Sequence, residues 1–287
     1  MPELAEVEYY RKQWNPGLGR TVHAVFLHER ARVFRGTDTG TLRTALTGAT
    51  LISSQAAAKQ MLFHFSSTKC AGSAKTATVP SVARRAKEGA WLGVHLGMSG
   101  ELHTEPVGYA PKKHDHLVLA TDTHAHVFTD PRMFGQIQFA LGETPPAWWT
   151  RLAPPILSDA FTAEAVAAFL RRRARSPVKA VLLMQERFPG IGNWMADEVL
   201  WRAAIHPKKP AGRLTPAEMR ALHRELRWVC RRALATIGET CADPPKSWLF
   251  PHRWEDGGLC PKTKKLLARA EIGGRTTCWS PARQKLK

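Results

Sequence analysis

The chain has 287 residues, 44% of them hydrophobic, which is enough for two domains with their own cores or for one large domain. Lysine and arginine outnumber aspartate and glutamate by 42 to 24, and the formal net charge of +18 favours a polyanionic partner, nucleic acid first of all. No signal peptide is visible, and no apolar run reaches the roughly 18 residues that span a bilayer, so we expect a soluble intracellular protein.

Charge alone does not identify the partner, because a ribosomal or membrane-surface protein can be equally basic. The cysteines add a second constraint: they number five, are scattered, and are never spaced C-x-x-C. Such a set does not form a disulfide framework, so reduced thiols in an intracellular setting are expected.

The first predicted element is a helix over residues 2–14, because apolar side chains recur there at intervals of three and four. Pro2 suits the first turn of a helix, and Glu3 and Glu6 complement its positive end. Pro2 also has a chemical interpretation, since it carries a free secondary amine once Met1 is removed. The local sequence does not decide between the two.

Residues 20–140 contain short apolar-rich runs separated by turn residues, a pattern typical of a β-sandwich or barrel. The runs are TVHAVFLHE, KQMLFHF, WLGVHLGM, HDHLVLAT, HAHVFTD and GQIQFAL. Between the second and third lies a small, polar and basic stretch, residues 69–90, which we expect to be a surface loop.

Prolines gather in residues 141–160 and indicate an interdomain linker, after which the pattern becomes helical. Thr215 is a candidate N-cap for a long helix, with Pro216 at its first position and Glu218 completing a capping box. From about Trp248 the chain is aromatic and basic, as in a β-hairpin with a tail.

Two glycine-rich turns have features of phosphate binding. In PGIGNWMADEVLW, Gly190 and Gly192 form a tight turn and Asn193 is a candidate cap for the next helix, whose first N–H groups can hold a phosphate. In EIGGRTT, the glycine pair predicts a hairpin turn that presents Arg275. An ordinary helix corner and a solvated arginine are the alternatives.

Three motifs lie between these regions: LGMSGEL with Met98, HDHLVL with His114 and His116, and DPRMFGQ with Arg132 and Phe134. Met, Arg and Phe on neighbouring loops are either ordinary core and surface residues or wedges that enter a duplex. The histidines, taken alone, are more often structural, and no H-E-x-x-H or similar metal spacing occurs.

Together these motifs resemble, in the same order, those of the formamidopyrimidine-DNA glycosylase and endonuclease VIII family. The motifs are PELAEVE, AAAKQML, LGMSG, HDH, DPRMFG, PGIGNWMADE and GGRTT, and they cover nearly the whole chain. The resemblance implies an α+β fold, with an N-terminal helix and β-sandwich followed by a helix–two-turns–helix domain and a hairpin finger. It also implies a base-excision-repair DNA glycosylase that removes oxidised bases and then cuts the abasic strand.

The resemblance favours the chemical interpretation of Pro2. It implies that the amine attacks C1′ of the damaged nucleotide and that the resulting iminium drives β- and then δ-elimination. Glu3 would help to open the deoxyribose and move protons, and Glu6 would support the site by hydrogen bonding. Lys59 matches a lysine that contacts phosphate near the lesion and serves in elimination, and Arg275 is linked to δ-elimination.

The implied DNA contacts begin with Asn193 and Arg275, which match the pair that holds the phosphates flanking the extruded nucleotide. Arg175, Lys179 and His114 match further DNA contacts. Three residues, one of which also belongs to the DNA-contacting set, match those that fill the gap left by base extrusion: Met98, Arg132 and Phe134.

The finger departs from the bacterial pattern, in which two C-x-x-C pairs bind zinc. The corresponding positions here are Cys260, Thr263, Ser280 and Arg283. One thiol out of four cannot hold tetrahedral zinc, so we expect a zincless finger similar to the plant and fungal type, and no metal or other cofactor. Aromatic packing would stabilise the finger instead, through Trp248, Phe250 and Trp279.

The stretch of roughly residues 239–250, between the long helix and the finger, is short. Family members with a strong 8-oxoguanine preference have a longer loop that caps the extruded base. The resemblance therefore implies a preference for hydantoins, formamidopyrimidines and oxidised pyrimidines. Ala5 and Met133 stand where proline and arginine are common; we expect the first change to be harmless and the second to tune opposite-strand contacts.

We expect a catalytic sandwich domain over residues 1–142, a linker over 143–159, a helix–two-turns–helix domain over 160–247, and the finger and tail over 248–287. The expected partner is damaged double-stranded DNA, bound by a monomer without membrane contact, in the cytoplasm or nucleoid, or in the nucleus of a eukaryote. Two alternatives remain, namely a catalytically inert DNA-damage-binding relative, and a ribosomal or RNA-binding protein with the same helical motif.

Overall fold

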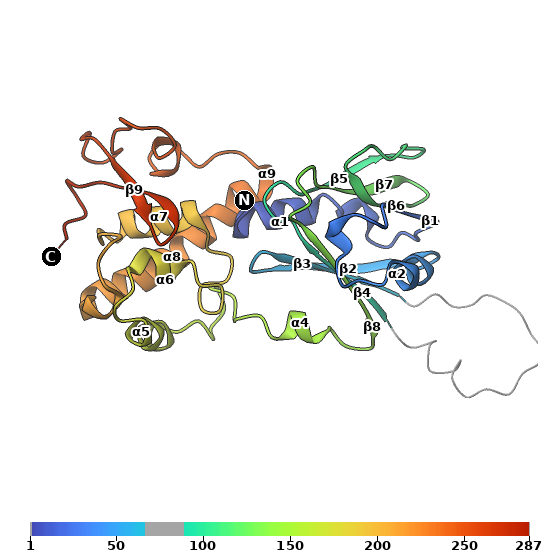
Figure 1. Cartoon of the computed structure of the whole chain (residues 1–287), viewed down its shortest axis with the longest axis horizontal. Helices are drawn as coiled ribbons and strands as arrows, with labels where there is room; N and C mark the ends of the chain where they lie inside the picture. Colours follow the sequence, from blue (N-terminus) through green and yellow to red (C-terminus); the bar gives the residue numbers. More distant parts are fainter. Residues whose placement is uncertain (1, 67–88, 287) are drawn as a thin grey trace, which may run out of the picture. The chain divides into compact units, whose positions relative to one another are not determined.

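The computed structural model describes residues 2–66 and 89–286 and divides into two compact units. The sandwich unit comprises Met1–Pro2 and Tyr10–Arg151, and the helical unit comprises Glu3–Tyr9 and Leu152–Lys287. Strands dominate the blue-to-green part of the chain and helices the yellow-to-orange part (Figure 1). The expected loop over residues 69–90 lies outside the described residues, except for residues 89 and 90, which begin a strand.

Two four-stranded antiparallel sheets form the sandwich unit, as the short apolar runs predict. The first sheet has the order β1 (Ala24–Leu27), β6 (Asp115–Ala120), β7 (His124–Thr129) and β5 (Glu101–Pro106). The second has the order β2 (Leu51–Ala57), β3 (Gln60–Phe65), β4 (Gly89–His95) and β8 (Gln136–Gly142). The sequence analysis missed β2 and β5, which are only partly buried.

Short helices complete the sandwich unit. They are η1 (Asn15–Gly17), η2 (Arg32–Phe34), α2 (Thr39–Leu46) and α4 (Ala147–Thr150). The amino end of α2 is capped by Asp38, whose carboxylate accepts the N–H groups of Gly40 and Thr41. The N-terminal helix α1 (Leu4–Lys12) is shorter than the predicted 2–14, and its first half belongs to the helical unit.

The helical unit has one large apolar core, to which all its longer helices contribute. Its helical elements are α5 (Ala163–Arg172), α6 (Val178–Leu182), α7 (Asn193–Arg202), η3 (Ala211–Arg213), α8 (Pro216–Ala235), α9 (Ile237–Thr240) and η4 (Phe250–His252). The predicted capping box of α8 is confirmed, because Thr215 and Glu218 each accept the other's backbone N–H. Among the described residues, no helix is long and apolar enough to cross a membrane.

The finger is a two-stranded antiparallel hairpin of β9 (Ala268–Ile272) and β10 (Arg275–Trp279). Ile272 pairs directly with Arg275, so Gly273 and Gly274 are the whole turn. Both have positive φ, 63° and 72°, as a type I′ turn requires. The prediction of a tight glycine turn that presents Arg275 is therefore confirmed, and the Arg275 side chain is exposed.

Candidate functional site

The carboxylate of Glu3 is bound by the amino end of α7. Its oxygens accept the backbone N–H groups of Gly192, Trp194 and Met195 at 2.8, 3.0 and 3.1 Å. Three N–H donors at the start of a helix stabilise a negative charge. The Glu3 side chain that receives them is almost completely buried. Glu3 is thus an anchored anion, one residue after Pro2 in the chain.

The turn before α7 is shaped to admit this carboxylate. A Cβ atom on Gly192 would lie 2.3 Å from the carboxyl carbon of Glu3, so no larger residue fits there. Gly190 has a φ of 87°, which favours glycine. The side chain of Gln185 accepts the Gly190 N–H at 3.0 Å and donates to the Ile191 carbonyl at 2.8 Å. The sequence analysis singled out both glycines but missed Gln185.

Glu6 lies one helical turn from Glu3 and is held by a tryptophan. Its carboxylate accepts the Trp194 indole N–H at 2.9 Å and the Glu3 backbone N–H at 3.2 Å. Burial raises the pKa of the Glu6 carboxyl above its ordinary value, although these hydrogen bonds oppose the rise. Trp194 was not predicted as a site residue; its place directly after Asn193 is the only local signal.

Asn193 does not cap α7 as predicted, since Gly192 is the N-cap residue and makes no side-chain cap bond. The N–H groups that a capping side chain would accept are taken by Glu3 instead. Asn193 Nδ2 donates to the Thr276 carbonyl in β10 at 2.8 Å, while its Oδ1 is buried without a hydrogen-bond partner. The structure thus brings Asn193 to the strand that begins with Arg275.

Lys179 corrects the sequence analysis, which predicted a DNA contact. Its side chain is completely buried, and the ammonium donates to the Asn193 carbonyl at 2.7 Å and to Asp197 Oδ1 at 2.5 Å. Burial lowers the pKa of the Lys179 ammonium, against the opposing charge of Asp197. A side chain so enclosed cannot reach a phosphate. Arg175, by contrast, is exposed before α6.

Within the sandwich unit, the three expected gap-filling residues lie on two linked loops. Met98 and Phe134 are 45% and 44% exposed, and the Arg132 guanidinium stacks over the Phe134 ring at 4.9 Å. Asp130 ties the loops together, accepting Ser99 Oγ at 2.7 Å and the Gly135 N–H at 2.7 Å. Exposed apolar side chains on braced loops suit insertion into a duplex.

His114 and Lys59 occupy turns of the same unit. The His114 carbonyl accepts the Asp130 N–H at 3.0 Å, so His114 adjoins the braced loops. Lys59 lies in the turn between β2 and β3, next to Ala58 with its φ of 58°, and is 9% exposed. The sequence analysis did not foresee the bracing role of Asp130, because it depends on contacts between loops.

The four positions expected to replace the zinc ligands of the finger use hydrogen bonds. Cys260 Sγ accepts the Trp201 indole N–H at 3.4 Å, and the Arg283 guanidinium donates to the carbonyls of Trp201 and Arg202, both at 2.8 Å. The Ser280 N–H donates to Gln284, which in turn donates to the Ile205 carbonyl. Burial raises the pKa of the Cys260 thiol, but hydrogen bonding from Thr263, Ser280 and Trp201 outweighs it and sets the pKa at about 7.

Each of the three aromatic residues expected to stabilise the finger packs on an aromatic side chain of its own. Trp248 packs on Trp228 and Phe250 on Trp194, with ring centroids 5.3 and 5.0 Å apart, while Trp279 contacts His206 at 5.4 Å. A small core joins the finger to α7: Trp201, Leu249, Cys260 and Cys278. In residues 2–66 and 89–286, no three His, Cys, Asp or Glu side chains are grouped to hold a metal ion.

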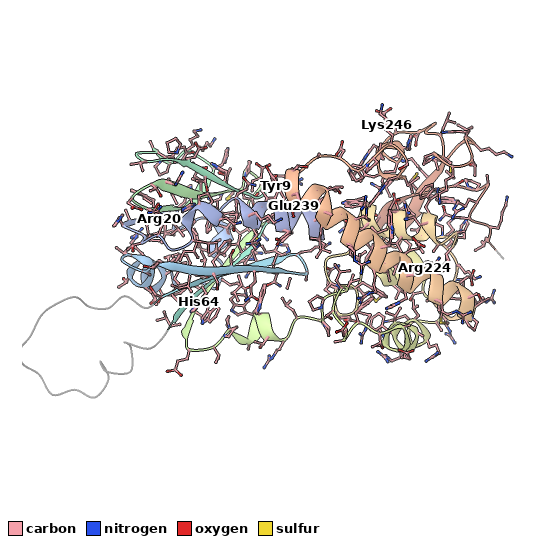
Figure 2. The ribbon with its side chains drawn as sticks, turned by 180° about the vertical axis from the view of Figure 1, so that it is seen from behind. Tyr9, Arg20, His64, Arg224, Glu239 and Lys246 are labelled. Atoms are coloured by element: carbon pink, nitrogen blue, oxygen red, sulfur yellow. The ribbon has the colours of Figure 1, made fainter. Side chains whose placement is uncertain are left out.

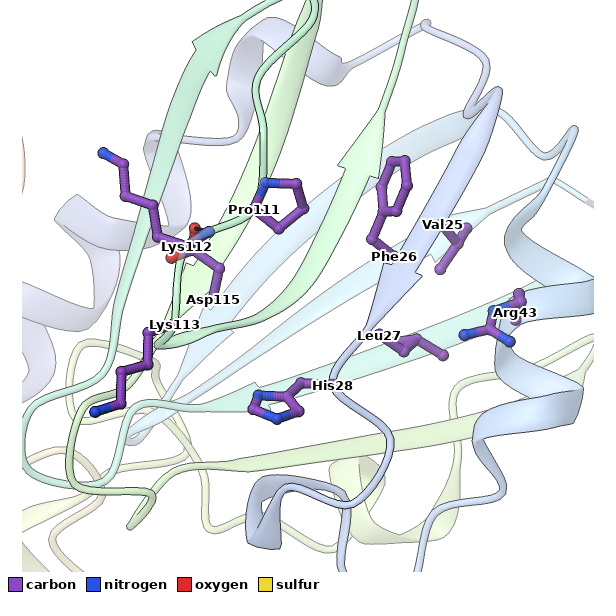
Figure 3. Close-up of a pocket in the computed structure, with 9 residues that line it drawn as sticks. All are labelled: Val25, Phe26, Leu27, His28, Arg43, Pro111, Lys112, Lys113 and Asp115. Atoms are coloured by element: carbon purple, nitrogen blue, oxygen red, sulfur yellow. Dashed lines mark hydrogen bonds between the residues drawn. The ribbon is translucent and has the colours of Figure 1, made fainter.

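A shallow hollow of about 620 Å³ also lies in the sandwich unit, along β1. Phe26 and Pro111 line it together with the basic Lys112, Lys113 and Arg43 (Figure 3). None of the predicted site residues lines this hollow, although His114 stands between two residues that do. Glu6, Asn193 and Arg275 lie in α1, α7 and β10, and other site residues lie on turns and loops.

The family comparisons cover both units. Residues 1–137 match the formamidopyrimidine-DNA glycosylase N-terminal domain, and residues 152–244 match the formamidopyrimidine-DNA glycosylase H2TH domain. The formamidopyrimidine-DNA glycosylase of Laribacter hongkongensis is 33% identical over 99% of this chain and all of its own length. The Roseiflexus sp. enzyme of the same name is 38% identical, covering 70% of this chain and 80% of its own.

Structural comparison agrees with the sequence matches. A crystal structure of Lactococcus lactis formamidopyrimidine-DNA glycosylase, non-covalently bound to DNA containing an abasic site, superimposes with a TM-score of 0.81. The alignment covers 99% of this chain and the whole of that one, at 22% sequence identity. At this identity the likeness establishes the fold alone.

Proposed function

Because the chain belongs to the formamidopyrimidine-DNA glycosylase family and is an enzyme of that family, a DNA glycosylase of base excision repair, we propose that it excises oxidised bases from duplex DNA and then cuts the strand at the abasic site. One observation carries the proposal: the α7 amino end binds the Glu3 carboxylate through three N–H groups, next to Pro2 in sequence. Three N–H groups hold this carboxylate in one position, which supports the role in proton transfer that we propose for it.

The proposed nucleophile is the secondary amine of Pro2, exposed by removal of Met1. An α-amino group has an ordinary pKa near 8, so a neutral fraction exists at physiological pH. The amine attacks C1′, the base leaves, and the resulting iminium acidifies the C2′ protons, which permits β- and then δ-elimination. Glu3 would transfer protons during ring opening, with Glu6 supporting the site. Lys59 and Arg275 would serve in the elimination steps.

The proposed DNA contacts follow the exposed basic and apolar residues. Asn193 and Arg275 would hold the phosphates beside the extruded nucleotide, with Arg175 and His114 as further contacts. Met98, Arg132 and Phe134 would fill the gap in the duplex; their exposure on braced loops supports this role. The net charge of +18 suits binding to a polyanion. The proposed enzyme acts as a monomer, in the cytoplasm or nucleoid, or in the nucleus of a eukaryote.

The proposed lesion preference rests on a short segment. Only residues 241–249 separate α9 from η4. A long loop that caps 8-oxoguanine has no room there, so hydantoins, formamidopyrimidines and oxidised pyrimidines would be better substrates. Excision rates on paired duplexes test this preference, and an 8-oxoguanine duplex cleaved fastest would overturn it.

Borohydride trapping tests the function itself. Duplex DNA with a guanidinohydantoin or an abasic site should be captured covalently by the native protein. An amino-terminal extension acylates the Pro2 nitrogen, so capture should be lost. Pro2→Gly replaces the secondary amine by a primary one, which can still form an imine, so capture should only be weakened. If the native protein binds the same duplex tightly without any capture, the inert DNA-damage-binding alternative is correct.

A further inference from the structure

One buried carboxylate connects the two residues assigned to phosphate binding. Asp197 lies on α7, one turn after Asn193, and its side chain is completely buried. Its Oδ1 is 2.5 Å from Lys179 Nζ, which also donates to the Asn193 carbonyl. Its Oδ2 accepts the Arg253 guanidinium at 2.7 Å and the backbone N–H of Cys278 at 3.0 Å.

These contacts form a closed chain between α7 and the finger. Thr276 and Cys278 are alternate residues of β10, so their backbone N–H and C=O groups point to the same edge of the strand. Cys278 is held by Asp197, and Thr276 is held by the Asn193 side chain. Two fixed points along one short strand determine both its distance from α7 and its direction. Arg275, which begins that strand, is therefore positioned from α7.

Asp197 is the carboxylate that contacts both buried cations of this group. Lys179 and Arg253 each contribute a positive charge, and both are at most 5% exposed. Asp197 supplies one negative charge, and Glu3 is close enough to act electrostatically on Lys179. Removing the Asp197 charge leaves buried cations without their nearest counterion, which a protein interior tolerates poorly.

We propose that Asp197 is a positioning residue for phosphate binding. By holding the Cys278 N–H of the finger, it sets the placement of Arg275 relative to Asn193. This inference rests on the proposed function, because Asn193 and Arg275 matter only if they hold DNA phosphates. Asp197 itself touches no DNA. It acts through β10, so its effect must depend on Arg275 being present.

A double-mutant cycle on DNA binding tests that dependence without requiring catalysis. The probe is a duplex containing tetrahydrofuran, an abasic-site analogue, and the Kd is measured for the native protein, Asp197→Asn, Arg275→Ala and the double variant. We expect Asp197→Asn to weaken binding about tenfold with Arg275 present and by less than about threefold in the Arg275→Ala background. Equal weakening in both backgrounds would show a merely structural role and overturn the proposal.

Glu198→Gln is the matched control. Glu198 is the next residue on the same helix and is equally buried, but it accepts the N–H groups of Leu249 and Phe250 rather than that of a finger strand residue. Its effect on Kd should be the same with and without Arg275. Coupling of Glu198 to Arg275 as strong as that of Asp197 would contradict a specific role for Asp197.

Two further measurements keep the outcome clear. If Asp197→Asn does not fold, the triple variant Lys179→Met, Asp197→Leu, Arg253→Met replaces the ion cluster by apolar side chains, which buried clusters often tolerate. It should fold yet show the same dependence on Arg275. Borohydride trapping by the native protein is run in parallel: failure to trap contradicts the proposed chemistry, whereas an additive cycle contradicts only the role of Asp197.

Discussion

Two buried aspartates, one in each unit, are satisfied in opposite ways. In the sandwich unit, buried Asp130 accepts Ser99 Oγ and the backbone N–H groups of Arg132 and Gly135. In the helical unit, buried Asp197 is surrounded by the cations of Lys179 and Arg253. Asp130 therefore relies on neutral donors from neighbouring loops, whereas Asp197 relies on compensating charges from distant segments.

Burial shifts titratable groups in both units. It lowers the pKa of His64, His95, His116 and His126 in the sandwich unit and that of His206 in the helical unit. His64 lies on β3 (Figure 2). Its ring stacks on that of Trp91, with the ring centroids 4.0 Å apart. In the helical unit, burial also raises the pKa of Glu198 to about 7. Protonation of His126 and deprotonation of Glu198 should thus weaken the two units over different pH ranges.

Breaking the ion cluster should have the largest effect on stability. Asp197→Ala leaves Lys179 and Arg253 buried without their shared counterion, and we expect a loss of about 3–5 kcal/mol in the free energy of unfolding. Urea denaturation monitored by hydrogen exchange in the helical unit measures it. Asp256→Ala is the control, because Asp256 is 90% exposed in its pair with Arg269 and should cost less than about 1 kcal/mol. Similar losses in the two variants would contradict the comparison.

Acidification should weaken the sandwich unit through His126. Burial, with a smaller contribution from the neighbouring charge of His124, lowers the His126 pKa from 6.5 to about 4. Between these values the unfolded chain binds a proton that the folded one excludes, so stability falls as pH falls from about 6.5 to 4, by on the order of 3 kcal/mol. Hydrogen exchange in β5 and β7 across this range measures the loss. His126→Phe should abolish this part of the pH dependence, and an unchanged slope would assign it elsewhere.

Glu198 should give the opposite slope in the helical unit. Its pKa is raised from 4.5 to about 7 by burial, against the lowering effect of Arg202 and of the N–H groups of Leu249 and Phe250. The folded state therefore holds a proton that the unfolded chain releases, and stability falls as pH rises from about 4.5 to 7, again by on the order of 3 kcal/mol. Hydrogen exchange of peptides around residues 198 and 249 measures this loss, and Glu198→Gln should make it independent of pH over this range. A helical unit that becomes more stable over the same rise would contradict the assignment.

Local sequence was sufficient where an element depends on its own neighbours. The capping box of α8 and the glycine turn of the finger have that character, since the determining residues lie within a few positions of each other. The strands with nearly continuous apolar runs were also predicted, whereas β2 and β5 were missed because polar residues interrupt them. Residue periodicity detects burial, and these two strands are only partly buried.

The site was predicted less completely, because its contacts join segments far apart in the sequence. The glycines at 190 and 192 were recognised as a turn that binds an anion, but the anion is the carboxylate of Glu3, nearly 190 residues away. That carboxylate displaces Asn193 from its predicted capping role. Lys179 was expected on the surface because no local signal reveals Asp197 as its partner. An acidic residue among the apolar side chains of α7 is the signal that could have indicated a buried ion pair.

The smallest expected effect comes from Glu6, a carboxylate of the helical unit that has a neutral side-chain donor. Trp194→Phe removes the indole N–H from Glu6 and retains the aromatic ring against Phe250. We expect a loss of about 1 kcal/mol in the free energy of unfolding, the ordinary cost of one hydrogen bond, far below the loss for Asp197→Ala.

The pKa of Glu6 should rise further in Trp194→Phe, because the indole N–H lowers it in the native protein. Thermal unfolding and the pH dependence of single-turnover base excision measure the two effects. Trp254→Phe is the control, since Trp254 also contacts Phe250 edge-on but is 52% exposed. A pH profile that shifts equally in both variants would show that the Trp194 indole does not act through Glu6.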